Sequence, residues 1–367
     1  QRYSEWVILI PVKSFMFLLF CVFVLFTAPI VTSCSSGERG EPPEISELRY
    51  KGATLAHIHR IVRGYGSEKS RALHKYLKQA GYNAVQLNTF AYVRDINSVE
   101  VLSGGDPSLS EKYVVAEINA LHDMGFKVML KPHIWMGGYE FDPDNWRSNI
   151  DFKDPAERRR WFESYGDFIV SEAKIAEETG VEIFVIGTEL VALSKYREDW
   201  EGLIAKVRQV YGGELTYAAN GMNAANIEFW GSLDYIGIDA YFRLTDKVNP
   251  TVTELVKGWS PYESEIAGLS RKYGKNVIFT EIGFKSVEGT AIEPWRWDGE
   301  GGGSQQEQAR AFEAAGIVFR NKPYLAGVFI WKYFTDMDSY EKRNLEKGFT
   351  PYGKKAERVI SEWFGNG

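Results

Sequence analysis

Short apolar runs alternate with helical patterns from about Tyr50 to the end of the chain. Eight runs are rich in β-branched and aromatic residues, which favour strands. These runs are Ala53–Ile58, Ala84–Phe90, Val128–Trp135, Ile183–Leu190, Leu215–Asn220, Tyr235–Phe242, Val277–Phe284 and Val328–Phe334. Helical spacing of apolar residues predicts helices over Ser67–Gln79, Ser110–Met124, Pro155–Glu178, Glu198–Val210, Glu263–Lys272, Gln305–Arg320 and Lys355–Phe364, with a short one near Asn226–Leu233. Eight strand–helix units predict a single (β/α)8 TIM barrel rather than an open sheet.

Glycine follows the apolar pattern of five predicted helices. These glycines are Gly81, Gly125, Gly180, Gly212 and Gly274. Glycine adopts the left-handed conformation that closes a helix at little cost, so the helices are expected to end there.

The segment before the barrel pattern has the features of a secretory signal. Its apolar run, Phe15–Phe26, follows Lys13 and is too short to span a bilayer comfortably. Residues Val31 to Cys34 resemble the box of bacterial lipoproteins, whose cysteine becomes lipidated. Cys34 is therefore the expected lipidation site, and an ordinary cleaved signal with a chance cysteine is the alternative.

These features predict three parts: a signal and lipobox segment over residues 1–34, a flexible tether over 35–47 and the barrel over 48–367. The glycines and serines after Cys34 are typical of a flexible tether. A lipid anchor would hold the protein on the membrane of a bacterial cell envelope, facing the periplasm or the cell surface.

Composition narrows the possible partners. The formal net charge is -6 and no basic face is evident, so nucleic acid is not an expected partner. Cys21 and Cys34 are the two cysteines, so the predicted barrel has no disulfide and no thiolate metal site. Aromatic residues make up 14% of the chain, which suits stacking on sugar faces, although composition alone favours a large core containing them. We expect a monomer.

Seven of the predicted strands end in polar residues or tryptophan. These ends are Asn88, Lys131–Trp135, Gly187–Glu189, Asn220, Asp239–Tyr241, Thr280–Glu281 and Trp331. Active sites of such barrels lie at the C-terminal ends of the strands. Polar groups there are costly unless they are paired or solvated in a cleft. The pattern therefore predicts a functional cleft at this end of the barrel.

Two glutamates follow strongly apolar strands. Glu189 ends the fourth predicted strand and Glu281 the seventh, so their carboxylates face each other across the barrel mouth. Retaining glycoside hydrolysis uses two carboxyl groups roughly 5–5.5 Å apart, one to attack the anomeric carbon and one to protonate the leaving oxygen. A structural glutamate paired with Lys131 or an arginine is the alternative for either residue alone, and the pair favours catalysis.

Six segments, in order along the chain, carry a resemblance to a known family. They are Leu130–Trp135, Ile186–Leu190, Leu215–Asn220, Phe229–Trp230 with Leu233–Tyr241, Phe279–Phe284 and Gly327–Trp331. The chain resembles the retaining barrel glycosidases of clan A and, more narrowly, glycoside hydrolase family 113, whose described activity is mainly endo-β-1,4-mannanase.

The resemblance implies that Glu189 is the acid/base and Glu281 the nucleophile. Many clan A enzymes have an asparagine before the acid/base, where it grips the sugar 2-hydroxyl. Thr188 stands at that place here. Because mannose carries an axial 2-hydroxyl, a different grip is reasonable, and the reaction type is better defined than the substrate.

Further residues at the strand ends are candidates for binding a β-mannan or manno-oligosaccharide. Asn88, Lys131, His133 and Asn220 could bind sugar hydroxyls, although His133 could also be structural. Tyr241 is expected to point at Glu281, with a core tyrosine as the alternative. Asp239 could instead be an ion-pair partner for an arginine or lysine.

Tryptophans near the predicted cleft are candidate sugar platforms. Trp331 is expected under the reacting sugar, Trp135 at the wall of the cleft, and Trp295 with Trp297 at a further platform. Loop tryptophans can instead cover the core. No His/Cys/Asp cluster has metal-ligand spacing in the sequence, so we predict no catalytic metal and no cofactor.

Two other functions remain open. An exo-acting β-mannosidase, or another retaining β-glycosidase, would use the same barrel, because loops decide whether a cleft is open or closed. A non-catalytic glycan-binding lipoprotein is a more remote alternative, since such a protein is expected to lack one carboxylate and both glutamates are present.

Overall fold

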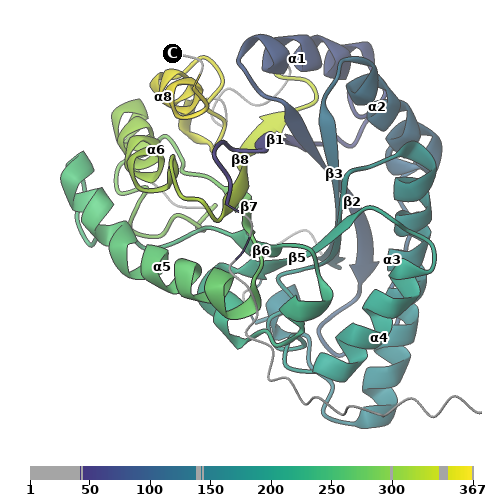
Figure 1. Ribbon diagram of the computed structural model, residues 1–367. Coiled ribbons are helices and arrows are strands. Elements are labelled where there is room, and N and C mark those ends of the chain that lie inside the picture. The colour runs from purple at the N-terminus through teal and green to yellow at the C-terminus, as the bar shows by residue number, and fades with distance from the viewer. Residues whose placement is uncertain are drawn as a thin grey trace, which may run out of the picture. The chain divides into compact units, whose positions relative to one another are not determined.

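Eight parallel strands pair in sequence order and close into a barrel, as predicted (Figure 1). The computed structural model describes residues 42, 44–137, 142, 144–297, 301–338 and 346–365. The strands are β1 (Tyr50–Ala56), β2 (Ala84–Val93), β3 (Lys127–Met136), β4 (Ile183–Thr188), β5 (Glu214–Asn220), β6 (Ile236–Asp239), β7 (Val277–Ile282) and β8 (Leu325–Phe334). The predicted signal, Cys34 and most of the tether lie outside the described residues.

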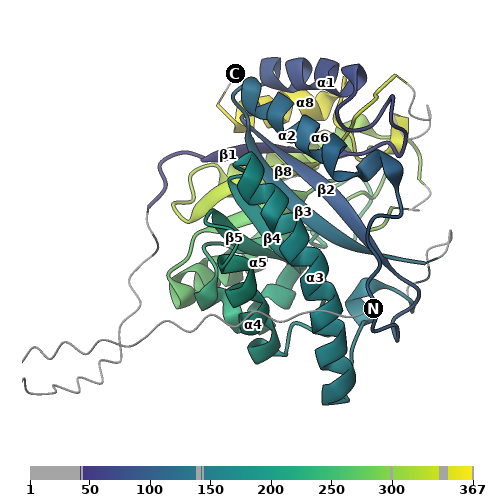
Figure 2. The same ribbon diagram turned by 90° about the vertical axis from the view of Figure 1, so that its right-hand side faces the viewer.

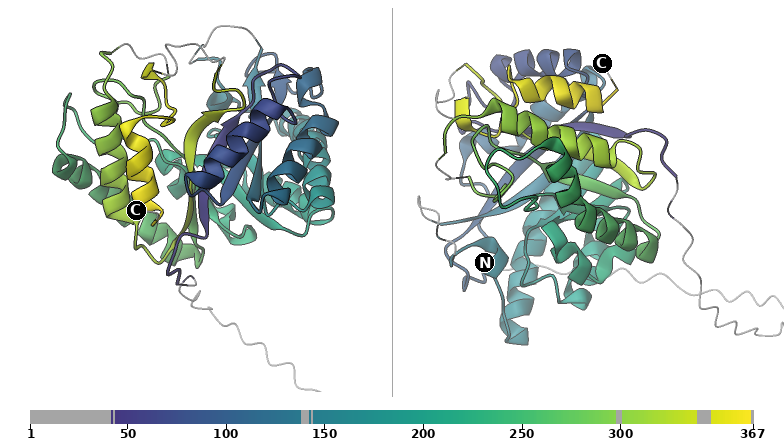
Figure 3. Two further views of the ribbon diagram at one scale, coloured as in Figure 1. Left: turned by 90° about the horizontal axis from the view of Figure 1, so that it is seen from above. Right: turned by 90° about the vertical axis from the view of Figure 1, so that its left-hand side faces the viewer.

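Helices surround the strand ring and connect successive strands (Figures 1 and 2). They are α1 (Glu68–Gln79), α2 (Glu111–Asp123), α3 (Pro155–Thr179), α4 (Arg197–Arg208), α5 (Val252–Tyr273), α6 (Gln305–Phe319) and α8 (Lys355–Trp363). Four short 3₁₀ helices add to them: η1 (Pro107–Leu109), η2 (Arg147–Asn149), η3 (Gly221–Asn226) and η4 (Phe229–Ser232). Figure 3 shows α6 and α8 side by side, which agrees with their extensive contact. None of the helices in the described ranges is long and apolar enough to cross a membrane.

Two predicted helix boundaries were wrong. Helix α5 was expected to begin at Glu263 but begins at Val252, because Thr251 and Glu254 form a reciprocal capping box and the helix continues through Pro261. Helix α4 ends at Arg208, so Gly212 does not close it, whereas Gly180 and Gly274 cap α3 and α5 in the left-handed conformation.

The barrel interior changes from apolar to polar along its axis. One end is filled by a cluster of buried residues: Tyr50, Ala84, Met129, Ile183, Val185, Ala218, Tyr235, Ile278, Ala326 and Phe329. Further along the strands, buried polar side chains replace them: Thr54, Gln86, Asn88, Lys131, Asp239, Thr280 and Glu281. Buried polar groups require partners, so this second layer marks the end of the barrel where chemistry is expected.

Irregular strand pairing is concentrated near the predicted catalytic residues. The register shifts between Val185 and Thr188 on β4 and between Ile238 and Asp239 on β6. It also shifts between Phe279 and Ile282 on β7. Such irregularities change the direction in which side chains project from a strand. They therefore affect the orientation of Glu189, Asp239 and Glu281.

Candidate active site

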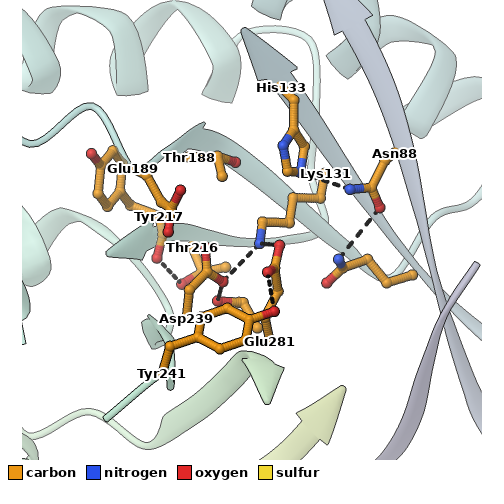
Figure 4. A network of polar contacts seen from close by, with 12 residues as sticks. Asn88, Lys131, His133, Thr188, Glu189, Thr216, Tyr217, Asp239, Tyr241 and Glu281 are labelled. Atoms are coloured by element: carbon orange, nitrogen blue, oxygen red, sulfur yellow. Dashed lines mark hydrogen bonds and ion pairs between the residues drawn. The ribbon is translucent and has the colours of Figure 1, made fainter. Parts of the chain in front are cut away.

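Glu281 is held by one donor on each carboxylate oxygen (Figure 4). It lies on β7, and its side chain is almost fully buried. Oε1 accepts a hydrogen bond from Lys131 Nζ at 2.6 Å, and Oε2 accepts one from Tyr241 OH at 2.8 Å. The predicted contact between Tyr241 and Glu281 is therefore present. Two donors therefore fix the orientation of the carboxylate.

The buried ammonium of Lys131 joins Glu281 to Asp239. Lys131 Nζ donates to Asp239 Oδ1 at 2.7 Å, and Thr280 Oγ1 donates to the same oxygen at 2.7 Å. Burial raises the pKa of Asp239 to about 8; the Glu281 charge adds to this rise and the Lys131 ammonium opposes it. Although burial opposes it, the two carboxyl groups raise the pKa of Lys131.

The charges of these three residues therefore balance at neutral pH. Asp239 carries the proton, and its buried Oδ2 has no hydrogen-bond partner among the described residues. Lys131 is then left with one full counter-charge, the carboxylate of Glu281. This arrangement places a cation, and no second full negative charge, against the carboxylate of Glu281.

Asp239→Asn is expected to keep most of the activity at pH 7, with a loss of roughly fivefold or less, because asparagine imitates a neutral carboxyl group. Its effect on stability depends on pH. The folded-state pKa is raised, so wild-type stabilisation by this proton is complete below about pH 4 and is lost as the pH rises through 8. Urea unfolding at pH 4, 6 and 8 should show the free energy of unfolding shifting in favour of the variant with rising pH. A constant difference would contradict the assignment of the proton.

Glu189 follows β4 in an unusual backbone conformation. It has a φ of 53°, in the left-handed region that non-glycine residues seldom adopt, and its amide donates to Ala218 O on β5 at 2.9 Å. Such a conformation costs of order 1–3 kcal/mol and is found mainly at functional sites. The turn takes Glu189 out of the strand direction at the barrel mouth, where Figure 4 shows it beside Asp239 and Tyr217.

A buried arginine contacts Glu189. Arg147 Nη2 donates to Glu189 Oε2 at 2.6 Å, and the two side chains are 8% and 12% exposed. Arg147 lies in η2, on the connection between β3 and α3. Each predicted catalytic glutamate thus has its own cationic partner, Lys131 for Glu281 and Arg147 for Glu189.

His133 and Asn88 form a second buried pair at this end of the barrel. Asn88 Nδ2 lies 2.7 Å from His133 Nε2, and Gln86 Nε2 donates to Asn88 Oδ1 at 3.4 Å. Burial, aided by the charges of Lys131 and Arg147, lowers the pKa of His133 well below its usual value. A neutral ring that accepts from Asn88 at Nε2 carries its proton on Nδ1, which leaves that nitrogen as a donor.

The predicted tryptophans differ in their surroundings. Trp135 ends β3 and is 43% exposed, with its ring edge-on to Trp146 at 5.3 Å. Trp331 lies on β8, and Lys332 Nζ lies 4.5 Å from the centre of its ring. An exposed ring beside polar groups is a surface on which a sugar can stack.

Other residues predicted to bind substrate make fewer contacts with the side chains around Glu189 and Glu281. Asn220 ends β5 with an exposed side chain, opposite Asp239 in the strand pairing. Trp295 and Trp297 are half-exposed in the connection between β7 and α6. Their roles in binding stay predictions.

Two strand-end residues are already engaged within the protein. Lys131 is fully buried and bound to two carboxyl groups, so its geometry favours orienting Glu281 over touching sugar directly. Thr188 is also buried, and its hydroxyl donates to Pro132 O at 3.1 Å. The Thr188 hydroxyl therefore does not provide the hydrogen bond to a sugar hydroxyl that an asparagine makes at this position in related barrels.

Arg147 and Lys332 were not predicted from the sequence. Arg147 follows no strand and belongs to no helical pattern, so only its nearness to other charges in space identifies it. Burial lowers the pKa of Lys332 to about 8, and the Glu281 charge opposes this shift. The one signal in the sequence was the position of Lys332, directly after the predicted platform Trp331.

One group of side chains in the described ranges has the spacing of a metal site. His57, His59 and Asp106 bring ligand atoms within 4.8 Å of one another. Hydrogen bonds engage both histidines, and His59 Nδ1 lies 2.5 Å from Asp106 Oδ2. His57 Nδ1 accepts from the Tyr65 amide at 3.0 Å, and His57 Nε2 lies 2.8 Å from Ser108 Oγ. Because Nδ1 accepts, Nε2 carries the proton and lacks the lone pair that a metal requires.

The sequence and the fold resemble those of known glycoside hydrolases. The sequence model of glycoside hydrolase family 113 matches residues 58–354. A search of curated proteins gives no match. A solved complex of a family 113 β-1,4-mannanase is 28% identical, with a TM-score of 0.77 over 87% of this chain and 100% of the other.

Two further solved structures resemble the chain. The family 113 β-mannanase from Alicyclobacillus acidocaldarius, in complex with ManMIm, is 25% identical, with a TM-score of 0.74 over 87% of this chain and 97% of the other. A family 5 mannosidase from Rhizomucor miehei is 10% identical, with a TM-score of 0.61 over 87% and 93%, and shares the fold alone. Because the family model covers most of the barrel, the chain belongs to glycoside hydrolase family 113.

Proposed function

We propose that the chain is a retaining endo-β-1,4-mannanase that hydrolyses mannan or glucomannan, with Glu281 as the nucleophile and Glu189 as the acid/base. The observation that carries the proposal is the pair of carboxyl groups at the ends of β4 and β7, each held by its own cation. The substrate class is supported by two solved family 113 structures, at 25% and 28% identity, that are described as β-mannanases.

Hydrolysis then proceeds in two displacements at the anomeric carbon. In the first, a Glu281 oxygen bonds to the anomeric carbon while Glu189 gives its proton to the departing glycosidic oxygen. In the second, Glu189 takes a proton from water, the water oxygen bonds to the anomeric carbon, and the bond to Glu281 breaks. Two inversions give retention, and both glutamates return to their starting states.

The partners of Glu281 suit attack rather than proton donation. Lys131 and Tyr241 each donate to one oxygen, which lowers the cost of keeping the carboxylate charged in a buried position. The protonated form of Asp239 removes the repulsion that a second carboxylate would add. The carboxylate of Glu281 is therefore already held in place for attack before the substrate binds.

The surrounding residues fit a sugar ring. His133 is neutral and can donate from Nδ1 to a hydroxyl, and the side chain of Trp331 on β8 is partly exposed. Trp135 extends the aromatic surface beyond the buried cluster. This combination of a few fixed polar groups and aromatic faces is typical of a carbohydrate site.

The substrate and the mode of cleavage are tested by a panel of mannan, glucomannan, cellulose and xylan, followed by the product profile on mannohexaose. The expected result is activity on the two mannans and early release of several internal cleavage products. Release of mannose alone from one end would favour the exo-acting β-mannosidase. A preference for cellulose or xylan would favour another retaining β-glycosidase.

We also propose that the mature protein is anchored to a bacterial cell envelope by a lipid on Cys34. Support comes from the lipobox-like residues before Cys34 and the Gly- and Ser-containing tether after it. Mass spectrometry of the mature N-terminal peptide, after expression of the full chain in a bacterium, tests this. A lipid mass on Cys34 is expected, and cleavage elsewhere with no added mass would overturn it.

A further inference from the structure

The connection between β3 and α3 brings a positive charge directly onto the predicted acid/base. Arg147 makes a monodentate contact with Glu189, from Nη2 to Oε2. Its guanidinium also lies over the ring of Trp146 at 4.5 Å, and Trp146 packs edge-on against Trp135. The aromatic support of Arg147 thus comes from its own loop and, through Trp135, from β3.

The other groups around Glu189 do not supply a comparable positive contact. Its charge acts on Tyr217 from β5, on Asp239 from β6 and on Tyr241 just after β6, which are neutral when protonated. Farther into the site, β3 contributes Lys131 and neutral His133, β7 contributes Glu281 and β8 contributes Lys332. Lys131 is already committed to Glu281 and Asp239. In the described part of the chain, the ion pair made by Glu189 is with Arg147.

We propose that Arg147 is the positioning residue of the acid/base: its guanidinium orients the carboxylate of Glu189. This inference rests on the proposed function and deepens it. An opposite charge in contact favours the ionised carboxylate, whereas the surrounding burial favours the neutral acid. Arg147 assists the second displacement by holding the Glu189 carboxylate in the position from which it accepts a proton from water.

The same contact limits the first displacement. Glu189 must then carry a proton, and the guanidinium makes that proton easier to lose. A monodentate contact suits a residue that changes protonation state twice in each turnover, because it holds the carboxylate less rigidly than two parallel hydrogen bonds would. Removing the guanidinium should extend activity to higher pH, and it should slow the second displacement because Glu189 is no longer held in place.

The test uses Arg147→Met, with Arg147→Gln as a second neutral variant and Arg147→Lys as the charge-retaining one. The pH profile of kcat/KM on mannohexaose is measured for each variant. For both neutral variants, the alkaline limb is expected to move up by at least about one pH unit. Arg147→Lys should keep the limb near its wild-type position.

An activated substrate, 2,4-dinitrophenyl β-mannobioside, separates the two displacements. Its leaving group needs no proton, so kcat/KM of Arg147→Met should stay within about threefold of wild type, whereas kcat, set by the second displacement, should fall by about 10–100-fold. KM should fall in parallel with kcat. A structural defect would instead lower kcat and kcat/KM together.

Arg158→Met is the matched control, because Arg158 also pairs with a carboxylate, Asp199 at 2.8 Å, and lies over an aromatic ring, Tyr196 at 4.1 Å, but on α3. This control variant should change neither the position of the alkaline limb of kcat/KM nor the relation between kcat and kcat/KM on the activated substrate. An unmoved limb in both neutral variants, with an active wild type, would overturn this inference alone. A wild type inactive on every β-mannoside would overturn the proposed function as well.

Discussion

Glu281→Gln is expected to lower kcat on mannohexaose by at least about 10⁴-fold, because glutamine cannot form the covalent bond on which both displacements depend. The change keeps the volume of the side chain and its acceptor oxygen for Lys131. Lys131 also retains Asp239, which can ionise when the Glu281 charge is gone. The fold should therefore survive, and circular dichroism and thermal unfolding would show it.

Glu263→Gln is the matched control for this change. Glu263 accepts hydrogen bonds from a lysine and a tyrosine, Lys322 and Tyr324, both at 2.8 Å, as Glu281 does from Lys131 and Tyr241. It lies on α5, away from the barrel mouth, and its glutamine variant should keep wild-type turnover. Wild-type-like turnover by Glu281→Gln would refute its role as nucleophile.

Glu189→Ala is expected to lower kcat/KM on mannohexaose by about 10²–10⁴-fold, the usual contribution of a positioned general acid. On 2,4-dinitrophenyl β-mannobioside the loss in kcat/KM should be small, because the leaving group departs without a proton. The second displacement still lacks its base, so kcat on this substrate should fall. Added azide should restore kcat by replacing water as the attacking group.

The azide product gives the control for this prediction. Retention predicts a β-mannobiosyl azide from Glu189→Ala, since azide would attack the covalent intermediate from the face that Glu189 leaves open. An equal loss on activated and natural substrates, with no effect of azide, would show that Glu189 is not the acid/base. The truncation leaves Arg147 without its carboxylate, so a lower thermal stability is also expected.

The barrel architecture was largely predictable because it depends on the local alternation of apolar and polar residues in each strand and helix. Strands of apolar and β-branched residues, separated by amphipathic helices, predict the barrel, and each observed strand overlaps a predicted run. Glu189 and Glu281 could be chosen because polar residues at the ends of apolar strands are rare and costly. Helix α5 was harder, since Pro261 interrupts the pattern and the capping box at Thr251 lies upstream of it.

The electrostatic arrangement of the site could not be predicted in the same way. Arg147 lies 42 positions before Glu189, in a connection with no periodic pattern, and its contact depends on how that loop folds over the barrel mouth. The proton on Asp239 depends on burial and on the distances to Lys131 and Glu281, which are tertiary properties. The pairing irregularities near Glu189 and Glu281 leave no mark in the sequence either.

Trapping of the covalent intermediate tests the assignment of Glu281 most directly. A 2-deoxy-2-fluoro-β-mannobiosyl fluoride has a good leaving group and a slowed second displacement, so the sugar should accumulate on the nucleophile. Peptide mass mapping of the wild-type protein is predicted to find the added fluorosugar on Glu281. A label on a different residue, or a first-formed hydrolysis product of inverted configuration, would contradict the account.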